Sequence, residues 1–278
     1  MMNLFSRWFR RSSTGAQQRD APEYSVHPPG LTFLTDVSVG RWVEDGFSPR
    51  FSTLGALVPD GFEAHARVLH PALDDAFEPV QWSTVAKWSG RVHHPLMSFE
   101  GISSPVDGHG AGGRPWLEDP NHGSMEEETA TELAASLSRF TGTPQHCYFG
   151  VWEGFGQYSG GAAMVTSDGR GRPLGIPRDI RRARRVRGVG RDYLLYAGRL
   201  EQITEFYSNF LSEPPNIWWP EDRAWFVATD IDLDSTYVGG NRECIAALLD
   251  DDTLEAVPAD PNASIGMTAD TINLGNPT

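Results

Sequence analysis

The chain has little cysteine and almost no lysine. Cys147 and Cys244 are its two cysteines, and they lie far apart in the sequence. This spacing provides neither a disulfide framework nor the close cysteine pair of a zinc site. Lys87 is the only lysine, so arginine carries nearly all of the positive charge. No apolar run is long enough to cross a bilayer or to form a signal peptide. We therefore expect a cytoplasmic protein without a transmembrane segment.

The composition is that of an acidic globular protein. Of the 278 residues, 39% are hydrophobic, which is enough to build a core. The formal net charge of -14 makes nucleic acid an improbable ligand, because phosphate backbones repel acidic surfaces. No cofactor motif is present: the glycine-rich segments 108–113 and 154–161 lack the ending and the strand-helix frame of a phosphate loop.

The polar and proline-rich start of the chain predicts a tail over residues 1–30. A single domain is expected over 31–258, with a second loose tail over 259–278. The first residues read MMNLFSRWFRRSS, in which Phe5, Trp8 and Phe9 lie among arginines. Such a segment could rest on an anionic membrane surface, although a frayed terminus is the expectation that we prefer.

Hydrophobic patterns and turn residues predict an α+β fold with a mostly antiparallel sheet and flanking helices. A hairpin is expected from residues 54–58 and 62–69, around a Pro-Asp-Gly turn. Expected helices are a short one capped by Ser83 and two longer ones over 125–140 and 199–211; further strands are expected at 147–152, 192–197 and 254–257. The connections are too short for regular βαβ units.

The densest structural signal is the stretch from 215 to 249. It contains the pair Trp218-Trp219, a charged turn, an apolar run over 225–229, and aspartates at alternate positions over 230–234. A turn at Gly239-Gly240 and an apolar helix follow. We expect a central strand, a short return strand and a capped helix, with the aspartates on the outer face of an antiparallel strand.

Three segments resemble a family of uncharacterised actinobacterial proteins. They read LVPDGFEAHARVLHP (57–71), TGTPQHCYFGVWEGFG (141–156) and PNIWWPEDRAWFVATDIDLDSTYVGG (215–240). The similarity covers most of 31–249 but neither tail nor the arginine-rich segment. It implies a bacterial, cytosolic protein, and it carries over no catalytic residue because the family has no assigned activity.

The aspartates of 230–234 permit a catalytic or metal hypothesis. Asp232 and Asp234 match the first motif of aspartate-nucleophile phosphatases, in which one carboxylate attacks phosphorus beside Mg²⁺. Asp230, Asp232 and Asp234 could also bind a divalent cation, but Ser235 stands where an EF-hand requires glycine. The phosphatases also need a downstream lysine, which the chain lacks.

The histidines and cysteines give weaker signals. Several histidines fall in the loop-rich stretch 93–122 without the short-spaced pair that zinc sites use. His146 precedes Cys147 on an expected strand, where adjacent side chains point to opposite faces. We therefore expect loop histidines and a buried structural cysteine.

Nine arginines lie between Arg170 and Arg191, and the segment 166–191 is expected to be an insertion with little core-forming character. The run from Arg178 to Arg191 places arginines at helical spacing. It could bind phosphate or an acidic surface, or it could be a solvated insertion, and the sequence alone leaves its role open. No aromatic residue lies among these arginines, which makes nucleic acid less suitable.

The leading functional hypothesis is a non-catalytic module that binds a protein partner through a tryptophan-rich surface. The expected surface comprises Trp152, Trp218, Trp219, Glu221, Asp222 and Arg223. Aromatic anchors beside charges are typical of interfaces, but the same tryptophans would also suit a core. The alternative is a hydrolase or phosphatase that uses a divalent metal at Asp230–Asp234.

Overall fold

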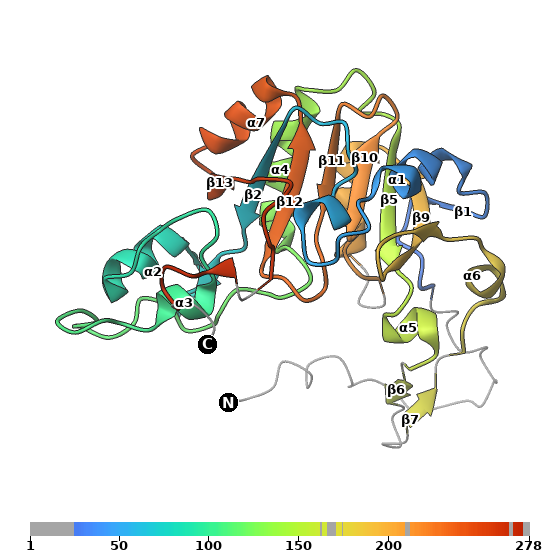
Figure 1. The fold of residues 1–278 in the computed structure, drawn as a ribbon. Helices are drawn as coiled ribbons and strands as arrows, with labels where there is room; N and C mark the ends of the chain where they lie inside the picture. The colour runs from blue at the N-terminus through green and yellow to red at the C-terminus, as the bar shows by residue number, and fades with distance from the viewer. Residues whose placement is uncertain are drawn as a thin grey trace.

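A nine-stranded sheet organises the computed structural model, which describes residues 25–161, 163–165, 171–173, 175–208, 212–266 and 269–274 (Figure 1). Every strand pairing is antiparallel, which confirms the expected α+β class. In spatial order the strands are β1 (Thr32–Leu34), β9 (Asp192–Gly198), β5 (Cys147–Trp152), β10 (Ile217–Pro220), β11 (Trp225–Ala228), β12 (Ser235–Gly240), β2 (Ala64–Leu69) and β13 (Ala256–Pro258), with β8 (Val186–Arg187) also paired to β9.

Two small hairpins and several helices surround this sheet. The hairpins are β3 (Ala72–Leu73) with β4 (Pro79–Val80), and β6 (Ala163–Val165) with β7 (Gly171–Pro173). The α-helices are α1 (Arg41–Gly46), α2 (Trp82–Ser89), α3 (Phe99–Ser103), α4 (Glu127–Ser138), α5 (Gly156–Ser159), α6 (Arg178–Arg182) and α7 (Arg242–Leu249), and the 3₁₀ helices are η2 (Ser38–Gly40), η3 (Leu54–Ala56) and η4 (Leu200–Phe206).

Capping contacts and first-turn charges account for the starts of three helices. Two glutamates lie in the first turn of α4, where the positive end of the helix dipole stabilises their negative charge, as the sequence predicts. At α7, the Asn241 side chain accepts a hydrogen bond from the Cys244 N–H at 2.8 Å. Helix α2 begins one residue before the expected cap at Ser83. The Glu255 carboxylate, rather than Ser83, accepts the hydrogen bonds of its first N–H groups.

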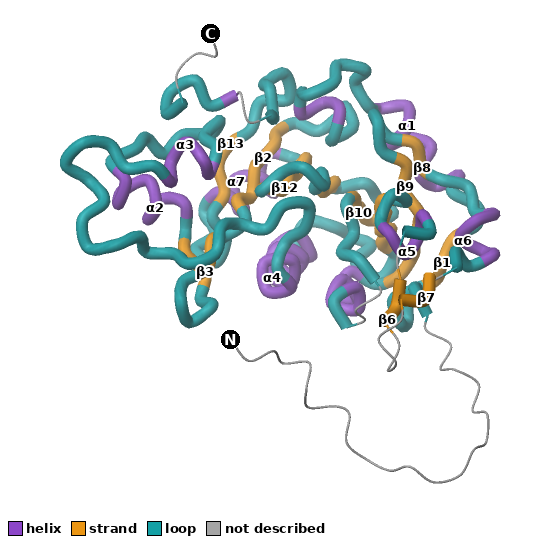
Figure 2. Tube along the Cα trace, turned by 90° about the horizontal axis from the view of Figure 1, so that it is seen from below, coloured by secondary structure: helices purple, strands orange, loops and turns teal. Residues whose placement is uncertain are grey.

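Both faces of the sheet are buried, which explains the apolar run of β11. Trp218 and Trp225 face the layer formed by α4, α7 and η4, and their rings meet edge to face at 5.4 Å. Trp219 and Phe226 face the opposite layer, formed by α1, η3 and nearby loops, and stack with centroids 5.7 Å apart. Figure 2 shows α4 and α1 on opposite sides of the strands.

A third apolar cluster lies beside the β2–β13 end of the sheet, where α2 and α3 form a lateral extension (Figure 1). The C-terminal segment completes this region: buried Asp270 accepts a hydrogen bond from the Ser98 N–H at 3.0 Å and lies 3.0 Å from His94. At the other end of the chain, Val26 is buried in the core beneath the helices. The packed part of the chain therefore extends beyond the boundaries expected at residues 30 and 258.

Local patterns gave the wrong element in four places. Residues 54–56 form η3, so β2 has no hairpin partner there and pairs with β12 and β13 instead. Residues 230–234 form a turn between β11 and β12. Gly239 and Gly240 lie within β12, where a Cβ on Gly239 would be 2.7 Å from the Phe62 ring. The expected helix over 199–211 is the 3₁₀ helix η4, and residues 209–211 lie outside the described residues.

The arginine-rich segment is part of the fold from residue 175 to 191. Ile180 on α6 and Val186 on β8 are both completely buried, in the layers on opposite faces of the sheet. The expectation that 166–191 contributes little to the core does not hold for this part. Residues 166–170 and 174 lie outside the described residues. In the described ranges, no helix has the length and apolar character needed to cross a bilayer.

Candidate anion-binding site

Two of the three tryptophans of the expected binding surface are core residues. Trp218 is 0% exposed and Trp219 is 1% exposed, so neither can contact a partner in this conformation. Because both faces of the sheet are covered, consecutive side chains on β10 are both buried, one on each face. Trp152, at the end of β5, is only partly buried and stacks edge to face on Phe155.

The charged turn after Trp219 remains exposed but has a structural role. The Asp222 carboxylate accepts hydrogen bonds from the Thr141 hydroxyl at 2.9 Å and from the Gly142 N–H at 2.7 Å. These bonds join the β10–β11 turn to the loop after α4. The Arg223 guanidinium lies over the Trp42 ring at 5.1 Å, and Glu221 is exposed. The residues of the expected surface therefore do not form one surface: Trp218 and Trp219 are buried, and the charged turn is held by contacts to the loop after α4 and to Trp42.

The aspartates of the candidate metal site are paired with arginines. Arg191 Nη2 lies 2.7 Å from Asp232 Oδ2 and 3.3 Å from Asp230 Oδ1. Asp234 Oδ1 lies 3.4 Å from Arg67 Nη2, and that guanidinium also donates to the Met97 carbonyl. Among the described residues, no group of three carboxylate, histidine or cysteine side chains is arranged to hold a metal ion. The guanidinium groups supply the positive charge that a divalent cation would bring to these carboxylates.

The histidines and Cys147 also have structural partners. His93 lies 3.1 Å from Glu255, and buried His70 lies between the Asn121 carbonyl and the Thr236 hydroxyl. Burial raises the pKa of the Cys147 thiol to about 12, so it is protonated at neutral pH and a poor nucleophile. His146 is exposed and immediately precedes β5. These positions agree with the structural reading of the sequence.

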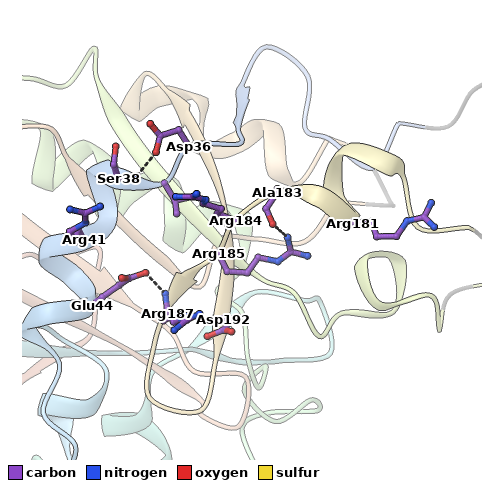
Figure 3. A pocket seen from close by; sticks show the side chains of 11 residues that line it. Asp36, Ser38, Arg41, Glu44, Arg181, Ala183, Arg184, Arg185, Arg187 and Asp192 are labelled. Atoms are coloured by element: carbon purple, nitrogen blue, oxygen red, sulfur yellow. Dashed lines mark hydrogen bonds between the residues drawn. The ribbon is translucent and has the colours of Figure 1, made fainter.

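A cavity of about 580 Å³ lies where the segment after β1 meets the arginine-rich segment (Figure 3). Its walls combine residues from 36–44 with residues from 181–192. Five arginines and three carboxylates dominate the lining, which comprises Asp36, Val37, Ser38, Arg41, Glu44, Arg181, Ala183, Arg184, Arg185, Arg187 and Asp192. In Figure 3, Arg184 and Arg187 lie between Arg41 and Arg185 in this arginine pocket, and the Arg181 side chain points away from the other arginines.

Close packing fixes the two walls against each other. Gly40 precedes α1, and a Cβ at this position would lie 2.6 Å from a methyl group of Val186. Glycine is therefore needed for the close approach of α1 to β8. Across the same contact, Glu44 Oε1 accepts a hydrogen bond from the Arg187 N–H at 2.9 Å. Buried Ile180 anchors α6 on the far side. The base of the pocket is therefore closely packed.

Some charged groups of the arginine pocket have partners within the protein, and others do not. Arg185 Nε binds Glu153 Oε2 at 2.7 Å, and the Glu44 carboxylate is engaged by a backbone N–H. Arg41, Arg181, Arg184 and Arg187 have no carboxylate within ion-pairing distance among the described residues. Four guanidinium groups are thus available to an anionic ligand, and each presents a planar set of donors that matches a carboxylate or a phosphate.

Two carboxylates of the pocket differ in their electrostatic setting. A hydrogen bond from the Ser38 N–H, 3.0 Å from Oδ1, lowers the pKa of Asp36 and keeps it ionised. Burial, with a contribution from nearby Glu153, raises the pKa of Asp192. Asp36 and Asp192 can accept hydrogen bonds from N–H groups of a ligand, whereas the arginines select its acidic groups. The residues that line the pocket include no histidine or cysteine.

The sequence indicated only one wall of this pocket. The arginine run indicates a possible anion site, but no sequence pattern connects Asp36, Arg41 and Glu44 with it. They lie about 150 residues earlier in the sequence and reach the pocket through the pairing of β1 and β8 with β9. The buried Ile180 and Val186, two apolar residues among arginines, were the available signal that this segment packs on the domain.

Comparison with known proteins gives no relative for this chain: no family model, no curated protein and no solved structure matches it.

Proposed function

We propose that the protein is a non-catalytic binding module, and that its arginine pocket takes an acidic segment of a partner protein. The observation that carries this proposal is the set of four arginines that have no carboxylate partner within the described part of the chain, whose full sequence has a net charge of -14. Unpaired positive charge concentrated on an acidic protein favours an anionic ligand, and complementary charge also accelerates association.

The mixed lining favours a peptide over a simple anion. A segment rich in glutamate or aspartate carries carboxylates for Arg41, Arg184 and Arg187. Its backbone N–H groups can donate to Asp36 and Asp192, which would repel a phosphate group. The arginines come from separate segments of the chain and are spread along the pocket, as suits an extended ligand.

The test is isothermal titration of the full chain with a hexaglutamate peptide, with hexaglutamine as the uncharged control. We expect binding of hexaglutamate that weakens as salt is added, because these charges are accessible to solvent. Arg41→Gln and Arg184→Gln should each weaken binding about two- to fivefold. Arg182→Gln is the matched control: Arg182 lies on α6 beside Arg181 but does not line the pocket.

Equal losses with Arg182→Gln would show that the peptide responds only to overall charge, and would contradict the assignment of the pocket. Binding of inorganic phosphate in preference to hexaglutamate would identify a phosphate ligand instead. The hydrolase alternative would require Arg191 to release Asp230 and Asp232, so the geometry favours it less.

A cytoplasmic location belongs to the same proposal. Both cysteines are buried and free, an arrangement compatible with a reducing compartment. A bacterial origin is part of the same proposal, and it rests on the resemblance of residues 57–71, 141–156 and 215–240 to uncharacterised actinobacterial proteins.

A further inference from the structure

A second and larger hollow, of about 800 Å³, lies between the first turns of α4, the β3–β4 hairpin and the segment that leads into β13. Its walls include the apolar side chains of Leu69, Leu73, Val80 and Leu254. Phe77, at the tip of the hairpin, is 64% exposed on its edge. This groove lies at the opposite end of the sheet from the arginine pocket (Figure 1).

The rim of the groove carries unpaired acidic residues. Glu127, Glu128 and Glu132 of α4 line it on one side and Asp252 on another. None of these four has an arginine, lysine or histidine within ion-pairing distance among the described residues. The combination of an apolar floor and an acidic rim fits a ligand with aromatic and basic side chains.

Burial, followed by neighbouring carboxylates, raises the pKa of two carboxyl groups on this rim. Burial, with a smaller contribution from Glu128, raises the pKa of Glu132. Burial and then Glu118 raise the pKa of Glu126 in the same way. A positive charge brought into the groove would relieve both effects, because it favours the ionised carboxylates.

The chain itself contains a segment of the required chemistry. Within residues 1–13, Phe5, Trp8 and Phe9 recur at intervals of three and four, and Arg7, Arg10 and Arg11 recur at the same intervals, two positions later. This pattern separates an aromatic face from a basic face. We propose that residues 4–11 bind in cis in the groove, with their aromatic side chains on its apolar floor and their arginines against its acidic rim.

The connecting segment is long enough for this contact. Residues 14–24 can span roughly 36–40 Å when extended. The whole path from β1 to β13 crosses seven strand spacings, or about 34 Å. Val26, near the start of the described chain, packs in the same layer as α4, so the connection does not have to pass around a sheet edge. This inference is independent of the function proposed for the arginine pocket.

Cross-linking of the full chain tests the proposal. Ser6→Cys is combined with Thr129→Cys, since Thr129 lines the groove, and a short bismaleimide is added at low protein concentration. The native cysteines are buried and should not compete. The control pair is Ser6→Cys with Ser159→Cys. Ser159 is exposed and follows Tyr158, whose hydroxyl binds the Val26 carbonyl at 3.3 Å, so an undocked N-terminus would reach it at least as easily.

Docking should raise the effective concentration of the Ser6→Cys thiol at residue 129 above that of a freely moving tether. We therefore expect the Ser6–Thr129 pair to react about tenfold faster than the control pair. Phe77→Asn should slow this reaction; asparagine tolerates the backbone φ of 64° at this position. The double change Glu127→Gln and Glu128→Gln should slow it about threefold or more. The double change Glu63→Gln and Glu243→Gln, at two exposed positions that do not line the groove, is the charge-matched control and should change nothing.

Equal rates for the two cysteine pairs would overturn the proposal. So would cross-links that form mainly between molecules, which would indicate binding to a second copy. If phosphatidylserine vesicles bind the protein and the Ser6–Thr129 product stays at the control level, the basic segment recognises a membrane surface instead. Should Thr129→Cys prevent folding, exposed Glu128→Cys serves in its place.

Discussion

The Arg191 guanidinium bridges Asp232 and Asp230, with its Nη2 atom 2.7 Å from the first carboxylate and 3.3 Å from the second. The same guanidinium lies over the Trp152 ring, 5.3 Å from its centroid. A single side chain thus connects the turn after β11 to the end of β5. The motif that suggested a phosphatase is, in this fold, a turn held by an internal cation.

Asp232→Asn should therefore be a mild change. The Asp232 side chain is 74% exposed, so the loss of its ion pair should lower the free energy of unfolding by less than about 1 kcal/mol. Mg²⁺ or Ca²⁺ should leave the melting temperature of wild type and variant unchanged. Thermal melts with and without each ion check both expectations. A metal-dependent rise in wild type that disappears in the variant would establish a metal site here.

Phe226→Ala should be severe, because Phe226 is completely buried on β11 and stacks on Trp219. Truncation of a buried aromatic residue leaves a cavity and typically costs about 3–5 kcal/mol. Urea unfolding monitored by circular dichroism measures the difference. Phe51→Ala is the control, since Phe51 is 71% exposed, and it should stay within about 0.5 kcal/mol of wild type.

Ile180→Ala tests whether the arginine-rich segment is integral to the domain. Its side chain is fully buried under α6, so we expect a loss of about 2–5 kcal/mol in the free energy of unfolding. Arg182→Ala on the same helix is exposed and should cost little. Equal and small effects in the two variants would restore the view that residues 175–191 are a dispensable insertion.

His70 should make stability depend on pH in a defined window. Burial lowers its pKa from 6.5 to about 4, so between these values the unfolded chain binds more protons than the folded chain. The free energy of unfolding therefore rises with pH in this window, and the stabilising contribution of neutral His70 is fully present above it. Between about pH 7.5 and pH 5, His70 should account for a loss of about 2 kcal/mol.

His70→Gln removes this titration while keeping a polar group beside Thr236. Denaturant melts of wild type and variant at the two pH values isolate the effect, since other titrating groups are common to both proteins. Parallel pH profiles would show that His70 is not buried in its neutral form.

Local sequence patterns correctly predicted the helices and strands whose secondary structure is determined by their own residues. The helix α4 follows from its acidic first turn and apolar face, and β5 and β9 follow from their buried runs. The pattern failed where tertiary packing decided the outcome. Residues 54–56 are apolar enough for a strand, yet they close one face of the sheet as a 3₁₀ helix.

The site was less predictable than the fold for a related reason. The composition of the tryptophan pair is typical of a binding surface. Burial of consecutive residues depends on both faces of the sheet being covered, and this cannot be predicted from the sequence of β10 alone. The arginine pocket depends on Gly40 meeting Val186 across a long separation in sequence. Neither the contact nor the resulting cavity leaves a local pattern.

The position of β2 between β12 and β13 has a consequence for synthesis of the chain. Arg67 on β2 and Ser235 on β12, which share a 2.8 Å hydrogen bond, are 168 residues apart. At 5–20 residues per second, the ribosome takes roughly 10 to 30 s to make the partners of β2 after β2 itself has emerged. During this interval a largely apolar strand has both edges unpaired, so folding must wait for late segments and is exposed to aggregation.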